Sequence, residues 1–288
     1  MNIVEYAVSR RSLYTVSWSQ NGDYIVCGGA EKYLIIVDPI GEEPNRLLTG
    51  FNGTITSLSI SPDSKLIAGA NDLGEIYVWS IEREQPLRTI KGHSGKITSI
   101  AWSGDGEFIA SAGEDRVVKI WNPTTEECLV VLRRHGREVT DVAWDPSGRF
   151  ILSCGADGKV IVWSLETWSP IKILTGHITG ANSISWSPDG SMIASGGQDR
   201  TVRLWSYRLG RVARVFKIPA SITKVRWDPT GKSILSVGAD GKIRIINLIG
   251  EKIEELPIAG QIVDAVWSPD GTSIACVDAD GKLYIISL

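Results

Sequence analysis

The chain has little of the chemistry on which most enzymes depend. It contains only three His and four Cys among 288 residues, whereas general acid–base catalysis near neutral pH most often uses His. It has no Gly-rich phosphate-binding loop ending in Lys and Ser or Thr, no nucleophile elbow and no zinc-binding helix motif. These absences argue against catalysis and against a bound cofactor or metal ion.

Long apolar runs and a surplus of positive charge are also missing. No stretch approaches the roughly 18 apolar residues of a membrane span, and the start, Met1 to Glu5, is unlike a secretion signal. The formal net charge of -3 argues against nucleic acid as a partner. We therefore expect a soluble protein of the cytoplasm, with the nucleus as an alternative in a eukaryotic cell.

Tryptophan, in contrast, is abundant and recurs at a regular interval. The repeated positions are Trp18, Trp102, Trp144, Trp186, Trp227 and Trp267, with Ile60 at the one place where the series lacks a Trp. The intervals are 40 to 42 residues, which is within the range of propeller blades. The chain therefore consists of seven copies of one unit.

Each copy contains four short apolar runs separated by turn residues. The copy IAWSGDGEFIASAGEDRVVKIW, from Ile100, shows three of them, and CLVVLR, from Cys128, is the fourth. The runs are rich in Ile, Val and Trp and are bounded by Gly, Pro, Asp and Ser, which is typical of strands and turns. The pattern predicts an all-β fold, a seven-bladed β-propeller with four antiparallel strands per blade.

The two ends of the chain predict how the ring closes. The last copy finishes its third strand near Ile286, just before the C-terminus, whereas IVEYAV, from Ile3 to Val8, precedes the first copy. An incomplete blade would expose unpaired backbone groups. We therefore predict that the N-terminal strand completes the seventh blade and that residues 1–288 form a single domain.

Three copies also share four residues at constant spacing. These sets are His93, Ser111, Asp115 and Trp121; His135, Ser153, Asp157 and Trp163; and His177, Ser195, Asp199 and Trp205. Together with the repeat length, they resemble the marks of WD-repeat (WD40) β-propellers, and the resemblance covers the whole chain. It implies that each set forms a buried hydrogen-bonded tetrad, with the imidazole between Asp and Ser and the indole N–H as donor. All three His are then structural.

The other four blades depart from this pattern. Ser9, Phe51, Ile218 and Ile258 stand at the His positions of blades 1, 2, 6 and 7. We expect these blades to form without the tetrad, because replacing a polar network by apolar residues need not destabilise a blade. The four Cys have no ligand spacing, and we predict that Cys27, Cys128, Cys154 and Cys276 are small buried residues.

The resemblance further implies a partner-binding face, the one that carries the turns before the first strand and between the second and third. Of the residues carried over by position, we single out Tyr14, Lys96, Glu114, Glu138, Asn182 and Gln198. One ring of these positions is mostly Thr, which predicts a small, uncharged channel mouth lined by hydroxyls with Tyr14 as its only aromatic. Binding hot spots favour Trp, Tyr and Arg. A solvated rim without a partner is the alternative.

One segment has an unusual charge. Between Arg200 and Trp227 there are eight Lys or Arg and no Asp or Glu, and Arg208, Arg211 and Arg214 lie close together. Such cations protect exposed edge strands from pairing; the alternatives are binding of an acidic partner segment or of nucleic acid. Trp168, outside the repeat positions, is either a lid over the outer strand or an exposed anchor.

These patterns favour a rigid, monomeric, non-catalytic scaffold or adaptor that mediates protein–protein interactions in macromolecular assemblies. The alternative is a propeller enzyme or a binder of a small ligand in the central channel. That alternative needs carboxylates or His pointing into the channel, and the predicted lining offers Tyr, Thr, Asn and Val instead.

Overall fold

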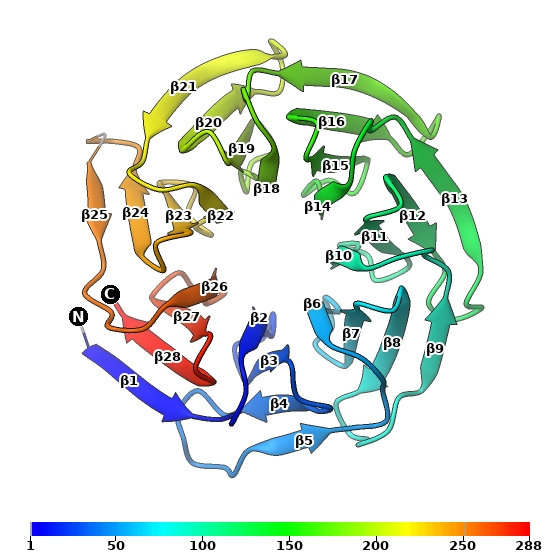
Figure 1. The fold of residues 1–288 in the computed structure, drawn as a ribbon, viewed down its shortest axis with the longest axis vertical. Coiled ribbons are helices and arrows are strands. Elements are labelled where there is room, and N and C mark those ends of the chain that lie inside the picture. The colour runs from blue at the N-terminus through cyan, green and yellow to red at the C-terminus, as the bar shows by residue number, and fades with distance from the viewer. Residues whose placement is uncertain (1, 251) are drawn as a thin grey trace.

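Short apolar runs between Gly- and Asp-containing turns give a ring of small sheets in the computed structural model. The structure describes residues 2–250 and 252–288, and in these ranges it contains 28 strands and no helix. The strands form seven four-stranded antiparallel sheets arranged as blades around a central axis (Figure 1). The predicted seven-bladed β-propeller is confirmed. Met1, at the start of the expected single domain, and Glu251 lie outside the described residues.

Each of blades 1 to 6 runs from an innermost to an outermost strand in chain order. Blades 1 to 3 contain β2 (Leu13–Trp18), β3 (Ile25–Gly29), β4 (Leu34–Val37) and β5 (Arg46–Leu48); β6 (Ile55–Ile60), β7 (Leu66–Asn71), β8 (Glu75–Ser80) and β9 (Arg88–Lys91); β10 (Ile97–Trp102), β11 (Ile109–Gly113), β12 (Val117–Trp121) and β13 (Cys128–Arg133). Blades 4 to 6 contain β14 (Val139–Trp144), β15 (Phe150–Gly155), β16 (Lys159–Ser164) and β17 (Ser169–Thr175); β18 (Ala181–Trp186), β19 (Met192–Gly197), β20 (Thr201–Ser206) and β21 (Arg211–Lys217); β22 (Ile222–Trp227), β23 (Ser233–Gly238), β24 (Ile243–Asn247) and β25 (Ile253–Glu255).

Blade 7 is assembled from both ends of the chain. It contains β26 (Ile262–Trp267), β27 (Ser273–Asp278) and β28 (Lys282–Ser287), with β1 (Asn2–Ala7) as its outermost strand. Strand β1 pairs with β28 along its whole length, from Asn2 opposite Ser287 to Ala7 opposite Lys282, and Figure 1 places the two termini at this blade. The prediction that the N-terminal strand closes the ring is therefore confirmed.

The turns between the first and second strands explain the recurring Ser-Pro-Asp-Gly sequence. In blade 5, Gly190 adopts φ +69°, a conformation that costs a glycine little. Asp189 Oδ1 accepts hydrogen bonds from the Ser187 hydroxyl at 2.6 Å and from Ser191 N–H at 3.0 Å. The Ser187 hydroxyl oxygen accepts from Met192 N–H at 2.9 Å, so the turn satisfies its own polar groups.

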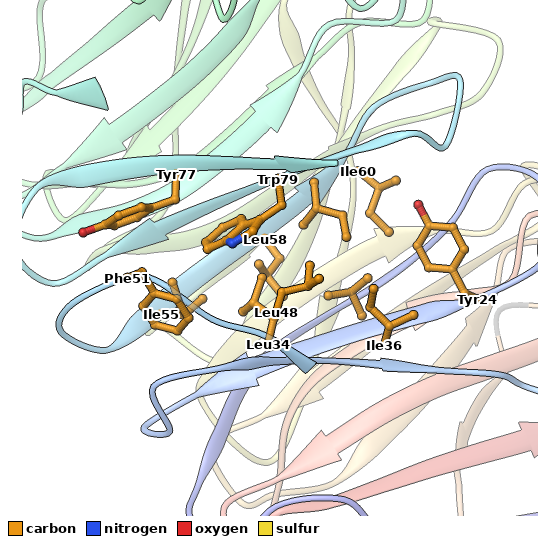
Figure 2. Close-up of a cluster of buried hydrophobic side chains, with 12 residues drawn as sticks. Tyr24, Leu34, Ile36, Leu48, Phe51, Ile55, Leu58, Ile60, Tyr77 and Trp79 are labelled. Carbon is orange, nitrogen blue, oxygen red and sulfur yellow. The ribbon is translucent and has the colours of Figure 1, made fainter. Parts of the chain in front are cut away.

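The core consists of apolar clusters between neighbouring blades. Between blades 1 and 2, Trp79 is fully buried and contacts Phe51 edge-on with ring centroids 5.6 Å apart (Figure 2). Cys27, Cys154 and Cys276 lie in second strands and are buried. The prediction for Cys128 is wrong: it lies on β13, an outermost strand, and is exposed because that strand has no outer neighbour.

A register shift recurs where the first strand of each blade pairs with the second. In every blade one residue near the start of the first strand has no partner across the ladder: Tyr14, Thr56, Thr98, Thr140, Asn182, Thr223 and Val263. Such a bulge changes the direction of side chains along the strand. It therefore decides which residues line the channel.

Candidate functional site

Blades 3, 4 and 5 each contain one hydrogen-bonded tetrad of His, Ser, Asp and Trp. In blade 3, Nδ1 of His93 lies 2.9 Å from Asp115 Oδ1, and Nε2 lies 2.7 Å from the Ser111 hydroxyl oxygen. The Trp121 indole N–H donates to the same hydroxyl at 2.7 Å. Blades 4 and 5 repeat these contacts through His135 and His177, with all distances between 2.7 and 3.0 Å.

The hydrogen bonds determine the state of each His. Because the serine oxygen accepts from the indole, its own proton is free to be donated to Nε2, which leaves Nδ1–H to donate to the Asp carboxylate. Burial lowers the pKa of His93, His135 and His177, and the neighbouring carboxylates only partly oppose this. Both ring nitrogens are therefore occupied in a neutral imidazole, and each His holds its blade together.

Three of the four blades without His carry a substitute network. In blade 6, the buried Arg244 binds both carboxylate oxygens of Asp240, at 3.2 and 2.6 Å. In blade 7, the Tyr284 hydroxyl donates to Asp278 at 2.9 Å, and in blade 2 the Tyr77 hydroxyl donates to Glu75. Arg244, Tyr284 and Tyr77 occupy one equivalent position, two residues before the third-strand Trp position. The tetrad itself is missing as expected, but the networks that replace it are polar rather than apolar.

The bulge residues join neighbouring blades at the mouth of the channel. The hydroxyls of Thr56, Thr98 and Thr140 donate to backbone oxygens of the next blade at 2.5 to 2.6 Å. Asn182 Nδ2 donates to Ile222 O in the same way, at 2.7 Å. These polar groups, including the candidate Asn182, are engaged within the ring, which limits what they offer to a partner.

Deeper in the channel, the residues that follow the bulge form a second set of links. Asp141 Oδ2 accepts from Ile184 N–H in the next blade at 3.0 Å, and Asp264 Oδ2 accepts from Val16 N–H at 3.2 Å, across the closure of the ring. Ser57, Ser99 and Ser183 accept in the same manner. Each of these side chains thus caps a backbone N–H of its neighbour.

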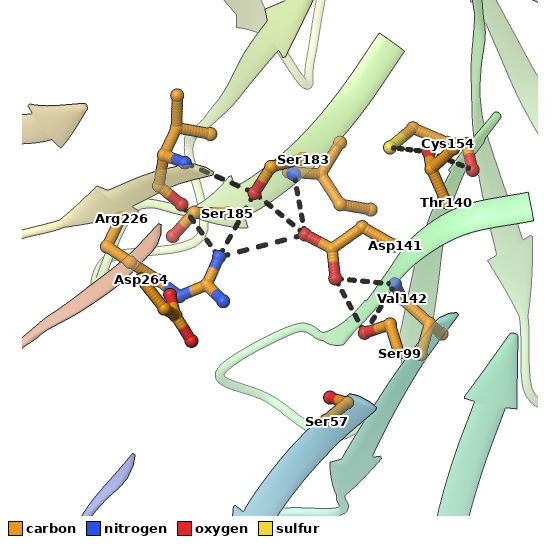
Figure 3. A network of polar contacts seen from close by, with 12 residues as sticks. Ser57, Ser99, Thr140, Asp141, Val142, Cys154, Ser183, Ser185, Arg226 and Asp264 are labelled. Carbon is orange, nitrogen blue, oxygen red and sulfur yellow. Dashed lines mark hydrogen bonds and ion pairs between the residues drawn. The ribbon is translucent and has the colours of Figure 1, made fainter. Parts of the chain in front are cut away.

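Asp141 is the centre of a charged network (Figure 3). It accepts from the hydroxyls of Ser99 at 2.6 Å and Ser183 at 2.8 Å and lies 3.7 Å from the guanidinium of Arg226. Burial raises its pKa, but the positive charges of Arg226 and Lys224 outweigh this and the net shift is downward. The predicted channel lining contained no carboxylates, and this prediction is wrong. The bulge at Thr140 also turns the next residue, Asp141, toward the channel.

This part of the channel is hollow. A cavity of about 430 Å³ is lined by charged, hydroxyl and apolar side chains, and its charged residues are Asp141, Asp145, Asp264, Lys224 and Arg226. It extends to Trp102, Trp144 and Trp186 at the ends of the first strands. We call the face where the first strands begin the upper face and the face where they end the lower face.

The upper face brings two of the candidate binding residues together. Tyr14 and Lys96 line a pocket of about 400 Å³ at the channel mouth with Asp72 and three Thr. Tyr14 is 38% exposed, which is large for an aromatic side chain beside a channel. Glu114, Glu138 and Gln198 are exposed near the same face but outside this pocket.

The basic segment does not form one patch. Arg203 lies 3.5 Å from the tetrad carboxylate of Asp199, whereas Lys224 and Arg226 point into the channel. Arg208, Arg211 and Arg214 are exposed on or beside β21, and Arg214 donates to Leu248 O of blade 6 at 3.0 Å. Trp168 is half-buried against the cluster that contains Trp144 and Phe108, so it acts as a lid rather than as an exposed anchor.

Over residues 2–250 and 252–288, no group of three or more His, Cys, Asp or Glu could hold a metal ion. The same part of the chain has no helix with the length and apolar character needed to cross a membrane.

Comparison with known proteins adds one match. The family model described as WD domain, G-beta repeat, matches residues 42–80, 84–122, 126–164, 168–206 and 210–247. Each matched segment ends with a third strand and begins at or near the outermost strand of the preceding blade, so the sequence repeat is offset from the blade by one strand. A search of curated proteins gave no match to this chain.

Proposed function

The chain belongs to the WD40 family, and on that basis we propose that it is a non-catalytic scaffold that binds other proteins, as a monomeric ring within larger assemblies. The observation that carries the proposal is the pocket at the channel mouth. There an exposed aromatic, Tyr14, lies beside a cation, Lys96, and a carboxylate, Asp72. Trp, Tyr and Arg are the side chains that most often dominate protein–protein binding, which makes Tyr14 the strongest candidate in this pocket.

The His residues and the channel carboxylates form hydrogen bonds within the ring, which supports a non-catalytic role. All three His of the sequence are tetrad members with both ring nitrogens hydrogen-bonded, so they serve the fold. Asp141 and Asp264 accept hydrogen bonds from backbone N–H groups of neighbouring blades. The rigid ring thus presents a preformed surface, which reduces the entropy cost of binding.

The test compares the proteins captured from the native cell by the wild type and by a Tyr14→Ala, Lys96→Glu variant. We expect at least one partner to be lost from the variant while the melting temperature stays within a few degrees of the wild type. Arg211→Glu, on the outer rim, is the control. Unchanged capture by the mouth variant together with loss in the rim variant would move the binding surface to β21.

A second candidate function rests on the channel cavity. Its lining contains three carboxylates, Asp141, Asp145 and Asp264, and two cations, which would suit a small ligand that carries both charges. The carboxylate of Asp141 is already engaged by two hydroxyls, a backbone N–H and Arg226, so protein binding at the mouth is the better-supported function. Binding of a small ligand would raise the melting temperature of the wild type and not that of Lys224→Ala.

A further inference from the structure

A groove lies at the junction of blades 1 and 2, next to the one blade whose first strand does not end in Trp. In two other blades this Trp helps to fill the space between blades on the lower face: Trp144 stacks on Phe108 of the preceding blade, and Trp186 packs edge-on against Tyr207 of its own blade, which in turn contacts Phe150 of the preceding blade. In blade 2, Ile60 takes this place and packs with Tyr24 and Ile36 of blade 1 (Figure 2).

A long loop forms the outer wall of this groove. Residues 38–45, between β4 and β5, make the longest connection between a third and a fourth strand. The loop stands over a groove of about 600 Å³ whose apolar lining includes Tyr24, Ile36 and Ile81. Ile40, also in the lining, is 77% exposed, so its side chain is accessible to a partner that enters the groove.

The groove continues outward along the edge of the ring. A second hollow of about 530 Å³ is lined by Leu47, Glu82 and Glu84. It shares Arg46 and Ile81 with the first groove, so the two adjoin. Together they offer an elongated surface, with room for several residues of an extended segment.

The rim of the groove is acidic. Its lining contains Asp23, Asp38, Glu42, Glu43 and Asp63 but only two cations, Arg46 and Lys65. Arg46 donates to Ile81 O at 2.7 Å and is thereby held in place. Among the described residues none of the five acids forms an ion pair. Lys65 adds a positive charge near Asp63, but acids outnumber cations in the lining by five to two.

Local hydrogen bonds keep two of these acids ionised. Asp38 accepts from the backbone N–H groups of Ile40, Glu42 and Glu43 at 2.9 to 3.0 Å, and the bond from Ile40 is the largest cause of its lowered pKa. The Ser61 hydroxyl lowers the pKa of Asp63 in the same way. The negative charge therefore persists well below neutral pH.

We propose that this groove docks an extended segment of a partner protein in which basic residues flank an aliphatic or aromatic side chain. The apolar side chain would pack on Tyr24, Ile36 and Ile40, and the basic residues would meet Glu42, Glu43 and Asp63. Charge complementarity selects this occupant over an acidic or neutral segment. The inference rests on the proposed function and names a second surface and the chemistry of its partner.

A second copy of this chain is the competing occupant, because β21 carries exposed valines and arginines. Figure 1 places β21 on the side of the ring opposite β5, so such a contact would be head-to-tail. Contacts of this kind form rings or open filaments. They would therefore appear as association that grows with protein concentration.

The test uses a fluorescein-labelled peptide with the core Arg-Lys-Leu-Lys-Arg between glycines and measures binding by fluorescence anisotropy. We expect the double variant Glu42→Lys, Glu43→Lys and the single variant Ile40→Ser each to weaken binding about tenfold. A peptide with Ser in place of Leu should bind less well, and binding should fall as salt rises. No binding to the wild type up to about 1 mM peptide would overturn the proposal.

Blade 3 supplies a matched control. Glu126 and Glu127 are adjacent exposed acids in its loop between the third and fourth strands. Reversing both to Lys changes the net charge equally, and we expect this variant to bind the peptide like the wild type. An equal loss in this control would show that the peptide responds to overall charge and would overturn the proposal. All variants change exposed side chains, and equal melting temperatures confirm that they are folded.

Two further outcomes separate the explanations. Oligomers of the wild type that disperse in the Glu42→Lys, Glu43→Lys variant, measured by sedimentation, would assign the groove to a second copy and overturn the partner proposal. If the groove variants bind the peptide normally while capture of cellular proteins still depends on Tyr14, the groove inference fails alone. If the wild type captures no protein at all, the proposed function fails with it.

Discussion

Replacing His135 by Ala removes the central member of the blade 4 tetrad. Ser153 and Asp157 then lose the imidazole to which they are bonded at 2.8 and 3.0 Å. A buried polar group without its partner costs about 1 to 3 kcal/mol, which for a chain of this size lowers the melting temperature by about 2 to 4 °C per kcal/mol. Other causes of destabilisation could produce the same loss, so its pH dependence is the sharper observable.

The sign of that dependence follows from the direction of the pKa shift. Burial lowers the pKa of His135 from 6.5, so near pH 6 the unfolded chain binds a proton that the folded blade does not. The stabilisation by neutral His135 is therefore complete above about pH 6.5 and declines as the pH falls toward the folded-state pKa. From about pH 7 to about pH 5, one His that stays neutral in the fold accounts for at most about 2 kcal/mol.

Urea denaturation followed by tryptophan fluorescence, at several pH values between about 5 and 7, measures this directly. We expect the difference in unfolding free energy between wild type and His135→Ala to shrink as the pH falls. Ile218→Ala, at the equivalent position of blade 6, is the control, since it removes buried apolar contacts and should give a loss of about 2 to 5 kcal/mol that is independent of pH. A His135→Ala difference that stays constant over the same range would refute the reasoning.

Three other perturbations test the ring and its surfaces. Deleting residues 1–8 uncovers the edge of β28, and we expect a lower melting temperature with dimers or aggregates by light scattering; a monomer of unchanged stability would contradict the closure. Asp141→Ala removes the acceptor for two hydroxyls and two backbone N–H groups and the ion-pair partner of the Arg226 guanidinium, and chemical denaturation should show a loss of about 3 kcal/mol, whereas a loss below about 1 kcal/mol would show that the network is dispensable. Reversing Arg208, Arg211 and Arg214 to Glu tests the basic edge, where new aggregation with unchanged capture of partners would identify edge protection and selective loss of a partner would identify an acidic ligand.

The ring and its closure could be predicted because both follow from counting. The Trp interval predicts seven blades, and IVEYAV, from Ile3 to Val8, is a strand-like run that is left over when the copies are counted. The spacing of His93, Ser111 and Asp115 likewise identified residues that the fold brings into contact. These signals are local or periodic, so a single sequence displays them.

The channel lining could not be read in the same way. A bulge changes which side chains point inward without leaving a mark in residue spacing, so Asp141, Lys224 and Asp264 went unnoticed. The substitute networks depend on Tyr77, Arg244 and Tyr284, which share one third-strand position. The structure shows that a side chain at this third-strand position contacts a carboxylate of the same blade, and the sequence alone does not indicate this contact. A search for long polar side chains there would have found all three.

The most direct test of the proposed function places a photoreactive amino acid at position 14, in the pocket with Lys96 and Asp72. After irradiation in the native cell, we predict a covalent adduct with another protein from position 14, and a weaker adduct or none from position 107, an exposed residue in the turn between β10 and β11 on the lower face. Adducts from position 211 on the outer rim and none from position 14 would contradict binding at the channel mouth.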